Sequence, residues 1–429
     1  MNKITTEYSE ELDESTFSTI LKNGLSVYVC KKKGFGKKIG LFGTKYGSVI
    51  NDFVDINTGK RMKVPDGIAH FLEHKLFEKE GANALDLFSQ MGVASNAYTS
   101  FDQTVYYFET NEKLKESIEM LVKLIKEPYF TDENVQKEQG IIGQEISMYD
   151  DDPNFMVYFN ALRAMYQRNP VRIDIAGTIE SISNITKELL YTCYNTFYSP
   201  QNMFFIVVGD VDVDDTIKTI EENIKKYDNK IVSNSNIEKF IEEEPKEIAK
   251  KEIVQKMEIF LPQICIAYKL DLCDGAKVRK NDIVASIVSD MYFSKQSDFF
   301  ENEYNLGRVN GSIDIQYEGS EYFSHVIVSA TSSDLNKVES DILDYIEKIK
   351  NETIDEELFE TIRRKKIGEV ILSSDTLSVS YRRIIDSILN NTNVYLDVEI
   401  LKSLKSSDIK EFLENLDENR RVTSKIIAK

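Results

Sequence analysis

The feature that most constrains the fold of this chain is a similarity between its two halves. The segment Ala69–Phe77 (AHFLEHKLF) aligns with Ala285–Phe293 (ASIVSDMYF), with apolar or small residues at corresponding positions. In the same way, IIGQEI at 141–146 aligns with KIGEVI at 366–371. A supersecondary unit that occurs twice in one chain predicts two domains with similar folds.

The ionisable residues of the first copy are missing from the second. His70 aligns with Ser286, and Glu145 aligns with Val370. Glu73 and His74 align with Ser289 and Asp290. This pattern favours a functional site in the first half and a second half that keeps only the scaffold.

Strand-like and helix-like segments alternate along the chain. Segments 23–32, 37–49, 96–110 and 202–210 are rich in β-branched and aromatic residues, which favour strands. Segments 113–130 and 211–227 have the apolar spacing of amphipathic helices. The fold class is therefore predicted as α+β, with two internally similar domains, each an antiparallel sheet with helices packed on it. Residues 227–250 are polar and charged, which predicts a linker between domains 1–226 and 251–429.

Two of the three histidines lie four residues apart, in the sequence His70-Phe71-Leu72-Glu73-His74. A helix that starts after an N-cap at Asp66 and continues to about Phe77 places both imidazoles and Glu73 on one face. Side chains at i and i+4 are close enough to bind one ion, with Glu73 beside it as a base. The alternative is a surface helix with an accidental spacing, which a chain with so few histidines rarely produces.

A metal site needs at least one more ligand, and a second acidic helix offers two. Glu138 and Glu145 are two helical turns apart and share a face. One would bind the metal, while the other would hold a histidine ring in place. Gly140 and Gly143 weaken this helix, which predicts that another helix packs very close to it. His325, the remaining histidine, is predicted to be buried and hydrogen bonded.

Composition excludes some functions. The net charge of −19 argues against nucleic-acid binding and is compatible with cationic partners. No apolar run is long enough for a membrane span, and no secretory signal is expected. The four scattered cysteines predict reduced thiols. The expected location is therefore cytoplasmic.

The chain resembles the M16, or inverzincin, metallopeptidases over nearly its whole length, and most of all their short bacterial two-domain members. The resemblance includes HFLEH at 70–74, NAYTS at 96–100, the Glu138…Glu145 pair, GTIESISNIT at 177–186 and YSPQNMFFIVVGDVD at 198–212. It implies one zinc ion per chain. It further implies roles for seven residues: His70, His74 and Glu145 as zinc ligands, Glu73 as general base, Glu138 as a supporting carboxylate, and Asn96 and Ala97 on an edge strand that holds the substrate.

The resemblance also implies a zinc endopeptidase that hydrolyses short or unfolded peptides, basic ones included, inside an enclosed chamber. Such a chamber is formed by four domains, so a two-domain chain must pair with a second subunit of the same kind into a clamshell. The alternative is a zinc-bearing, non-catalytic or peptide-binding subunit of such a complex.

One departure from the family concerns the second half. Many active relatives carry an arginine and a tyrosine there, seven positions apart, which contact the substrate. Glu301 and Arg308 occupy the matching positions in this chain. Tyr304, Arg308 and Tyr317 are the candidate substitutes for the pair. The missing groups could instead come from a different chain, which favours a heterodimer over a homodimer.

Overall fold

A computed structural model describes residues 3–227 and 237–429. Among these residues, the first half forms a seven-stranded sheet in the order β1-β2-β3-β11-β4-β10-β9. Its strands are β1 (Thr5–Ser9), β2 (Glu14–Ile20), β3 (Ser26–Lys31), β4 (Lys38–Thr44), β9 (Ala94–Thr99), β10 (Thr104–Thr110) and β11 (Met203–Gly209). These bounds confirm the strands predicted within 23–32, 37–49, 96–110 and 202–210.

The second half forms a five-stranded sheet in the order β12-β16-β13-β15-β14, again within the described residues. Strand for strand, this order matches β3-β11-β4-β10-β9 of the first sheet. The internal similarity read from the sequence therefore corresponds to a repeated topology. The strands are β12 (Glu252–Met257), β13 (Gln263–Lys269), β14 (Ile313–Gly319), β15 (Ser324–Thr331) and β16 (Arg421–Ala428).

The prediction of purely antiparallel sheets is wrong, because both sheets are mixed. β3 pairs with β11 in parallel, and β12 pairs with β16 in parallel at the equivalent place. In each half the last strand returns to the sheet after a long helical segment. A helical connection of this kind lets a strand re-enter a sheet in either direction, whereas a short hairpin forces the antiparallel one.

The helices of the two halves also correspond. α1 and α9 follow equivalent strands, and α3, α4 and α5 correspond to α11, α12 and α13 in chain order. The helices of the first half are α1 (Ile68–Phe77), α2 (Ala84–Gln90), α3 (Leu114–Lys126), α4 (Asp132–Asp150), α5 (Pro153–Met165), α6 (Ile179–Ile182), α7 (Lys187–Phe197) and α8 (Val213–Lys225). Those of the second half are α9 (Gly275–Val288), α10 (Asp298–Asn305), α11 (Leu335–Asn351), α12 (Glu356–Ser373), α13 (Leu377–Asn390), α14 (Leu396–Ser403) and α15 (Ser406–Glu414).

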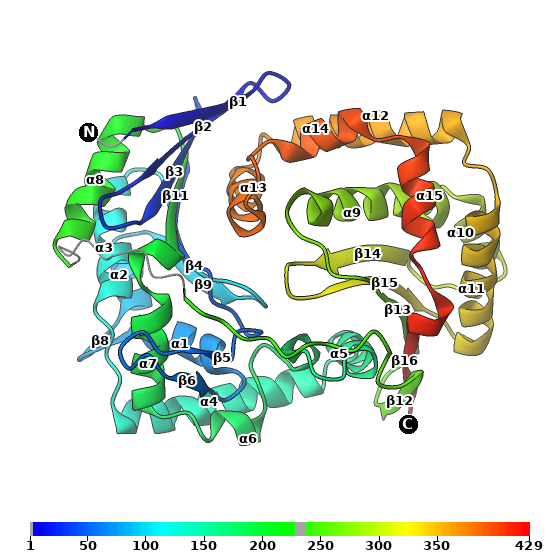
Figure 1. Cartoon of the computed structure of the whole chain (residues 1–429), viewed down its shortest axis with the longest axis horizontal. Helices are drawn as coiled ribbons and strands as arrows, with labels where there is room; N and C mark the ends of the chain where they lie inside the picture. Colours follow the sequence, from blue (N-terminus) through cyan, green and yellow to red (C-terminus); the bar gives the residue numbers. More distant parts are fainter. Residues whose placement is uncertain (1–2, 228–236) are drawn as a thin grey trace.

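The two halves exchange equivalent helices. α13 packs on β3 and β11 of the first sheet, whereas α5 packs on β12, β13 and β16 of the second (Figure 1). Ile384 of α13 is buried in one cluster with Leu41 and Ile206 of the first sheet. The first sheet is therefore covered on both faces, by α1, α3 and α8 on one side and by α13 on the other.

Coverage on both faces explains the sequence of β11. Its residues MFFIVVG are all buried, with Phe205 and Val207 facing the cluster that contains α1 and Phe204 and Ile206 facing α13. A strand buried on both faces reads as a continuous apolar run rather than as an alternating one.

Two short hairpins and the connection between the halves complete the fold. The hairpins are β5 (Asp52–Val54) with β6 (Arg61–Lys63), and β7 (Glu78–Lys79) with β8 (Ala82–Asn83). Residues 228–236 of the predicted linker lie outside the described residues. The later part of the linker lies beside β5, since the Val54 N–H donates to the Glu238 carbonyl at 2.9 Å. The domain bounds 1–226 and 251–429 stay a prediction.

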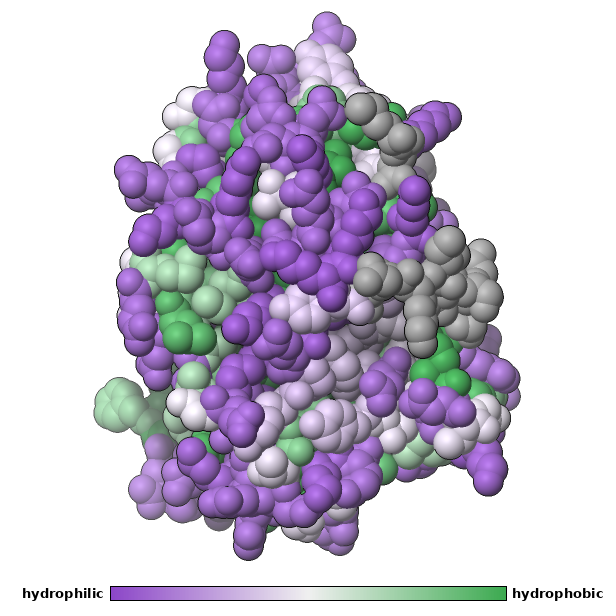
Figure 2. All heavy atoms as spheres, turned by 90° about the vertical axis from the view of Figure 1, so that its left-hand side faces the viewer, coloured by the Kyte–Doolittle hydropathy of each residue, from purple (hydrophilic) through white to green (hydrophobic). Residues whose placement is uncertain are grey.

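The outer face of the first half is mostly hydrophilic. Figure 2 shows this face with only small and separate hydrophobic areas among the described residues. The helices there, such as α8, turn apolar side chains inward and charged ones outward, as amphipathic helices do. Within residues 3–227 and 237–429, no helix combines the length and apolar character that crossing a membrane requires.

Candidate metal centre

Helix α1 presents the histidine motif. Ile68, Leu72 and Leu76 are buried against the core, which leaves His70, Glu73 and His74 on the other side of the helix. The predicted end of the helix at Phe77 is confirmed. The predicted N-cap at Asp66 is wrong.

The N-cap residue is Gly67, and no side chain caps the helix. Gly67 has φ +88°, and a Cβ there would lie 2.3 Å from the Ala176 carbonyl oxygen. Only glycine fits such a close approach in a left-handed conformation. Asp66 instead accepts a hydrogen bond from the Asn51 side chain at 2.7 Å, which fixes the loop in front of α1.

His70, His74 and Glu145 converge on one point, with their ligand atoms all within 4.8 Å of one another. His70 Nε2 lies 3.8 Å from one Glu145 oxygen, and His74 Nε2 lies 3.6 Å from the other. The ring centroids of the two histidines are 4.5 Å apart. Two imidazole nitrogens and one carboxylate are a donor set suited to zinc that leaves a fourth position for water or substrate.

The carboxylates of α4 lie on one face, as predicted. Glu138 Oε1 accepts a hydrogen bond from His74 Nδ1 at 3.1 Å, so the opposite ring nitrogen points to Glu145. The explanation offered for Gly140 and Gly143 is wrong, because a Cβ at either position would meet no atom within 4 Å. No packed helix requires these glycines, and nothing in the structure explains them.

Glu73 receives a hydrogen bond from the neighbouring sheet. The Thr99 hydroxyl, at the end of β9, donates to Glu73 Oε2 at 2.7 Å. Glu73 is 7% exposed, and burial raises the pKa of its carboxyl group despite this bond. A buried carboxylate beside a metal site, held by one hydroxyl, is a suitable proton acceptor.

The two histidines are in different electrostatic environments. Burial, followed by the neighbouring His74, lowers the pKa of His70 to about 3, so His70 is neutral at pH 7 and has a lone pair for a metal. Burial opposes the charged form of His74 as well, but the hydrogen bond with Glu138 raises its pKa. The pKa of Glu138 is lowered, because His74 and Lys75 outweigh the effect of burial.

Asn96 and Ala97 lie on β9, which is an edge strand of the first sheet. The Asn96 amide oxygen accepts a hydrogen bond from the Ala97 N–H at 2.8 Å, in an exposed position. β9 packs against α1. An extended peptide added along this edge would therefore pass close to Glu73.

Arg308 and Tyr317 make neither a hydrogen bond nor an ion pair with the motif residues in the described part of the chain. Arg308 pairs with Glu303 at 3.4 Å and Asp341 at 3.0 Å. The Tyr317 hydroxyl is hydrogen bonded to Cys273 and Ser324. Substrate-binding roles for Arg308 and Tyr317 stay a prediction.

His325 is buried, as expected. Its side chain is 0% exposed, and Nδ1 lies 3.0 Å from the Tyr166 hydroxyl. Its other ring nitrogen lies 3.4 Å from Glu318. This histidine joins β15 to Tyr166, the residue that follows α5, and is not part of the metal centre.

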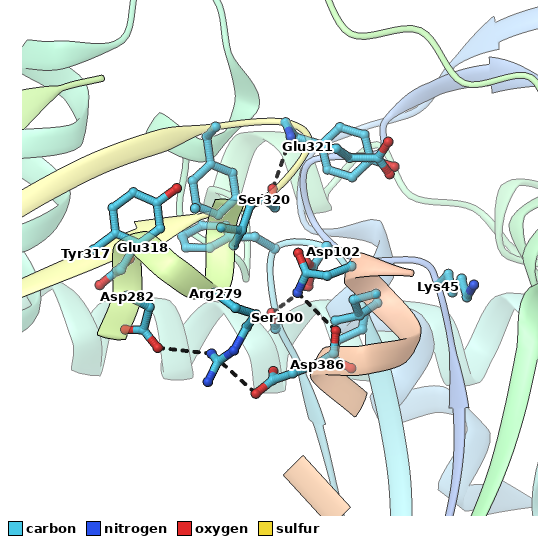
Figure 3. A pocket seen from close by; sticks show the side chains of 18 of the residues that line it. Lys45, Ser100, Asp102, Arg279, Asp282, Tyr317, Glu318, Ser320, Glu321 and Asp386 are labelled. Atoms are coloured by element: carbon cyan, nitrogen blue, oxygen red, sulfur yellow. Dashed lines mark hydrogen bonds and ion pairs between the residues drawn. The ribbon is translucent and has the colours of Figure 1, made fainter. Parts of the chain in front are cut away.

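Ser100, the residue after Thr99, lines a cavity of about 330 Å³. The β9–β10 turn, the β14–β15 hairpin, α9 and α13 all contribute to its lining. Figure 3 shows the Arg279 guanidinium beside Asp282 and Asp386. The charged residues of the lining are five carboxylates and three cations: Asp102, Asp282, Glu318, Glu321 and Asp386, with Lys45, Lys239 and Arg279.

Sequence reasoning missed two residues, Thr99 and Lys75. Thr99 contacts Glu73, which is 26 positions away in the sequence, and Lys75 contacts Glu138 at a separation of 63. Thr99 belongs to the NAYTS segment and Lys75 follows the motif directly. Spacing alone could not have found either contact, because each depends on how α1 packs on β9 and α4.

The chain matches two protein-family models. Residues 46–179 match "Insulinase (Peptidase family M16)", and residues 184–366 match "Peptidase M16 inactive domain". The chain is 34% identical over 423 residues to the zinc protease YmfH of Bacillus subtilis (strain 168), an alignment that covers 98% of each. It is 30% identical over 214 residues to the mitochondrial-processing peptidase subunit beta of Caenorhabditis elegans, covering 48% of this chain and 44% of that one.

A solved structure also matches. The crystal structure of an M16-like peptidase from Alicyclobacillus acidocaldarius aligns with a TM-score of 0.92 and 30% identity. The alignment covers 100% of this chain and 99% of that one. The similarity in sequence and in structure thus extends over both halves.

Proposed function

Because this chain belongs to the insulinase family of peptidases, M16, we propose that it is a zinc-dependent endopeptidase that hydrolyses short or unfolded peptides. The observation that carries the proposal is the convergence of His70, His74 and Glu145 beside the buried Glu73. The donor set fits zinc, since His70 is neutral and Glu138 orients His74.

His70, His74 and Glu145 would hold the ion. Bound zinc would act as a Lewis acid toward a peptide carbonyl and make water more acidic. Glu73 takes a proton from the water that attacks the carbonyl carbon, and it gives this proton to the amine nitrogen when the C–N bond breaks. Thr99 keeps the Glu73 carboxylate in place through its hydroxyl.

The substrate would bind along β9. An extended peptide that adds to the edge strand gains main-chain hydrogen bonds at Asn96 and Ala97. For this, the exposed Ala97 N–H has to exchange its hydrogen bond with Asn96 for one with the peptide. Main-chain pairing accepts many sequences, which suits a peptidase of broad specificity.

The test of this function is Glu73→Gln, with Glu133→Gln, a substitution of an exposed glutamate at the start of α4, as the matched control. Peptides of 10–30 residues are incubated with each zinc-loaded protein, and the cleavage products are identified by mass spectrometry. Glu73→Gln should abolish turnover and keep its zinc, whereas Glu133→Gln should match the wild type. Equal cleavage by Glu73→Gln and wild type would refute the role of Glu73 as general base.

The alternative is a zinc-bearing, non-catalytic or peptide-binding subunit. The contacts of Arg308 and Tyr317 support this alternative, because their polar groups are already paired within the second half instead of being free to bind a substrate. Such a subunit would bind zinc and peptides without cleaving them, and Glu73→Gln would change nothing. Zinc content together with the absence of cleavage in the wild type would select this alternative.

We further propose that the working enzyme contains a second M16-like subunit, and that a heterodimer is favoured over a homodimer. The relative from Caenorhabditis elegans is named as a subunit, which supports assembly with another chain. Light scattering of the purified chain, combined with the cleavage assay, separates the possibilities. An active dimer would establish a homodimer, and an inactive monomer that gains activity with a second chain would establish a heterodimer.

Basic peptides are the proposed preferred substrates. The cavity beyond Thr99 carries more carboxylates than cations, so it would attract an arginine or lysine side chain of a peptide lying on β9. Asp102 has no ion-pair partner among the described residues and accepts a hydrogen bond from Ser100 at 3.2 Å. Replacing arginine by citrulline in a cleaved peptide should raise KM for the wild type and have little effect on Asp102→Asn. An equal effect on both proteins would argue against this cavity.

A further inference from the structure

Lys75 is a fully buried lysine directly after the histidine motif. Its side chain is 0% exposed, in the last turn of α1. A buried ammonium group is strongly unfavourable unless charged and hydrogen-bonding groups surround it. An apolar residue would fill a buried position of this helix without that cost, so the contacts of Lys75 call for an explanation.

Lys75 has three partners. Its Nζ forms an ion pair with Glu78, donates to the Asn134 carbonyl at 3.2 Å and lies 3.5 Å from Glu138 Oε2. Asn134 and Glu138 are one turn apart on α4. Lys75 therefore ties α1 to α4 at the point where α4 supplies its carboxylates to the metal centre.

The Glu138 carboxylate is shared between two consecutive residues of α1. One oxygen accepts from His74 Nδ1 at 3.1 Å, and the other faces Lys75 Nζ. With both oxygens engaged, the carboxylate has little freedom to rotate. This fixed orientation keeps the His74 proton on Nδ1 and directs the Nε2 lone pair toward Glu145, 3.6 Å away.

We infer that Lys75 is a positioning residue of the metal centre, acting through Glu138 on His74. Among the described residues its ammonium group makes no hydrogen bond or ion pair with His70, His74 or Glu145. Its contribution is to hold the supporting carboxylate in one orientation. The inference rests on the zinc site proposed above and extends the set of residues that build it.

The experiment measures zinc affinity by competition with a chelator, together with the visible absorption spectrum of the Co²⁺-substituted protein. Lys75→Met keeps an unbranched, apolar side chain of similar length in the buried position. It should weaken zinc binding about 10–100-fold and alter the cobalt spectrum, and Glu138→Gln should have the same two effects. The double variant should be no worse than Glu138→Gln alone, because both changes remove the same restraint.

The matched control is Lys79→Met. The Lys79 ammonium joins β7, which follows α1, to the C-terminal end of α3. It donates to the Leu124 and Glu127 carbonyls, both at 2.6 Å. In the part of the chain that the structure describes, it makes no hydrogen bond or ion pair with a residue of the metal centre. Lys79→Met should therefore reduce thermal stability while zinc affinity and the cobalt spectrum stay those of the wild type.

Two results would overturn the inference. The first is a zinc affinity of Lys75→Met within twofold of the wild type. The second is a double variant whose loss of zinc affinity equals the sum of the losses of Lys75→Met and Glu138→Gln. If Lys75→Met does not fold, Lys75→Gln takes its place with the same expectations. A wild-type chain that binds no zinc would refute the proposed metal site itself. This outcome is distinct from the two results above, which would refute only the role of Lys75.

Discussion

Thr99→Val tests how much the hydrogen bond to Glu73 contributes to catalysis. Valine has nearly the shape of threonine but lacks the hydroxyl that lies 2.7 Å from Glu73 Oε2. Because Glu73 is 7% exposed, water cannot easily replace this bond. Hydrogen bonds to charged groups contribute about 1.5–3 kcal/mol, and 1.4 kcal/mol corresponds to tenfold in rate, so kcat/KM should fall about 10- to 150-fold.

The assay is steady-state cleavage of one peptide by zinc-loaded protein, with zinc content measured in parallel. The loss should appear in kcat rather than in KM, because Thr99 holds the base and not the substrate. Zinc content should not change, since Thr99 is not among the three converging ligands. Thr99→Ser, which keeps the hydroxyl, should retain most of the activity. A Thr99→Val enzyme within twofold of the wild type would refute the reasoning.

Three further changes test the fold and the ligand set. Gly67→Ala should lower the free energy of unfolding by more than the roughly 1–2 kcal/mol that a left-handed alanine costs, because the new Cβ would meet the Ala176 carbonyl. The control is Gly59→Ala, since Gly59 has φ +66° and open space around it. Gly59→Ala should lower the free energy of unfolding by only that amount, measured by urea unfolding. Ile384→Ala should lower the free energy of unfolding by about 2–5 kcal/mol, because Ile384 is 0% exposed between α13 and the first sheet. Glu145→Ala should reduce bound zinc to background in elemental analysis; retention of zinc would exclude Glu145 as a ligand.

The elements that were predictable from the sequence are those determined by local pattern. The helix that ends at Phe77 and the strand Met203–Gly209 have a clear periodicity or apolar run, and both are confirmed. The N-cap was mispredicted because Asp66 is a favourable capping residue by type. The close approach of Gly67 to Ala176, more than 100 positions away, decides the actual start of the helix.

Long-range pairing was less predictable. The parallel pairs β3–β11 and β12–β16 depend on how distant strands meet, which short-range patterns do not encode. The exchange of α5 and α13 between the halves was not predicted either. An amphipathic helix shows in its sequence that it has an apolar face, but not which sheet covers that face.

The metal centre was the most predictable part of the site, because ligand spacing on one helix is local information. His70 and His74 come together through helical geometry alone, and Glu138 and Glu145 share a face for the same reason. The groups that support them, Thr99 and Lys75, depend on the packing of α1 against β9 and α4. Their partners are therefore visible only in the folded chain.

Anomalous X-ray scattering at the zinc edge, from crystals of the purified chain, tests the central claim most directly. We expect one strong peak per chain at about 2.0–2.2 Å from Nε2 of His70, Nε2 of His74 and one Glu145 oxygen, with Glu73 outside the coordination sphere. A zinc-loaded crystal with no peak between these side chains, or with its zinc bound elsewhere, would refute the proposed zinc site.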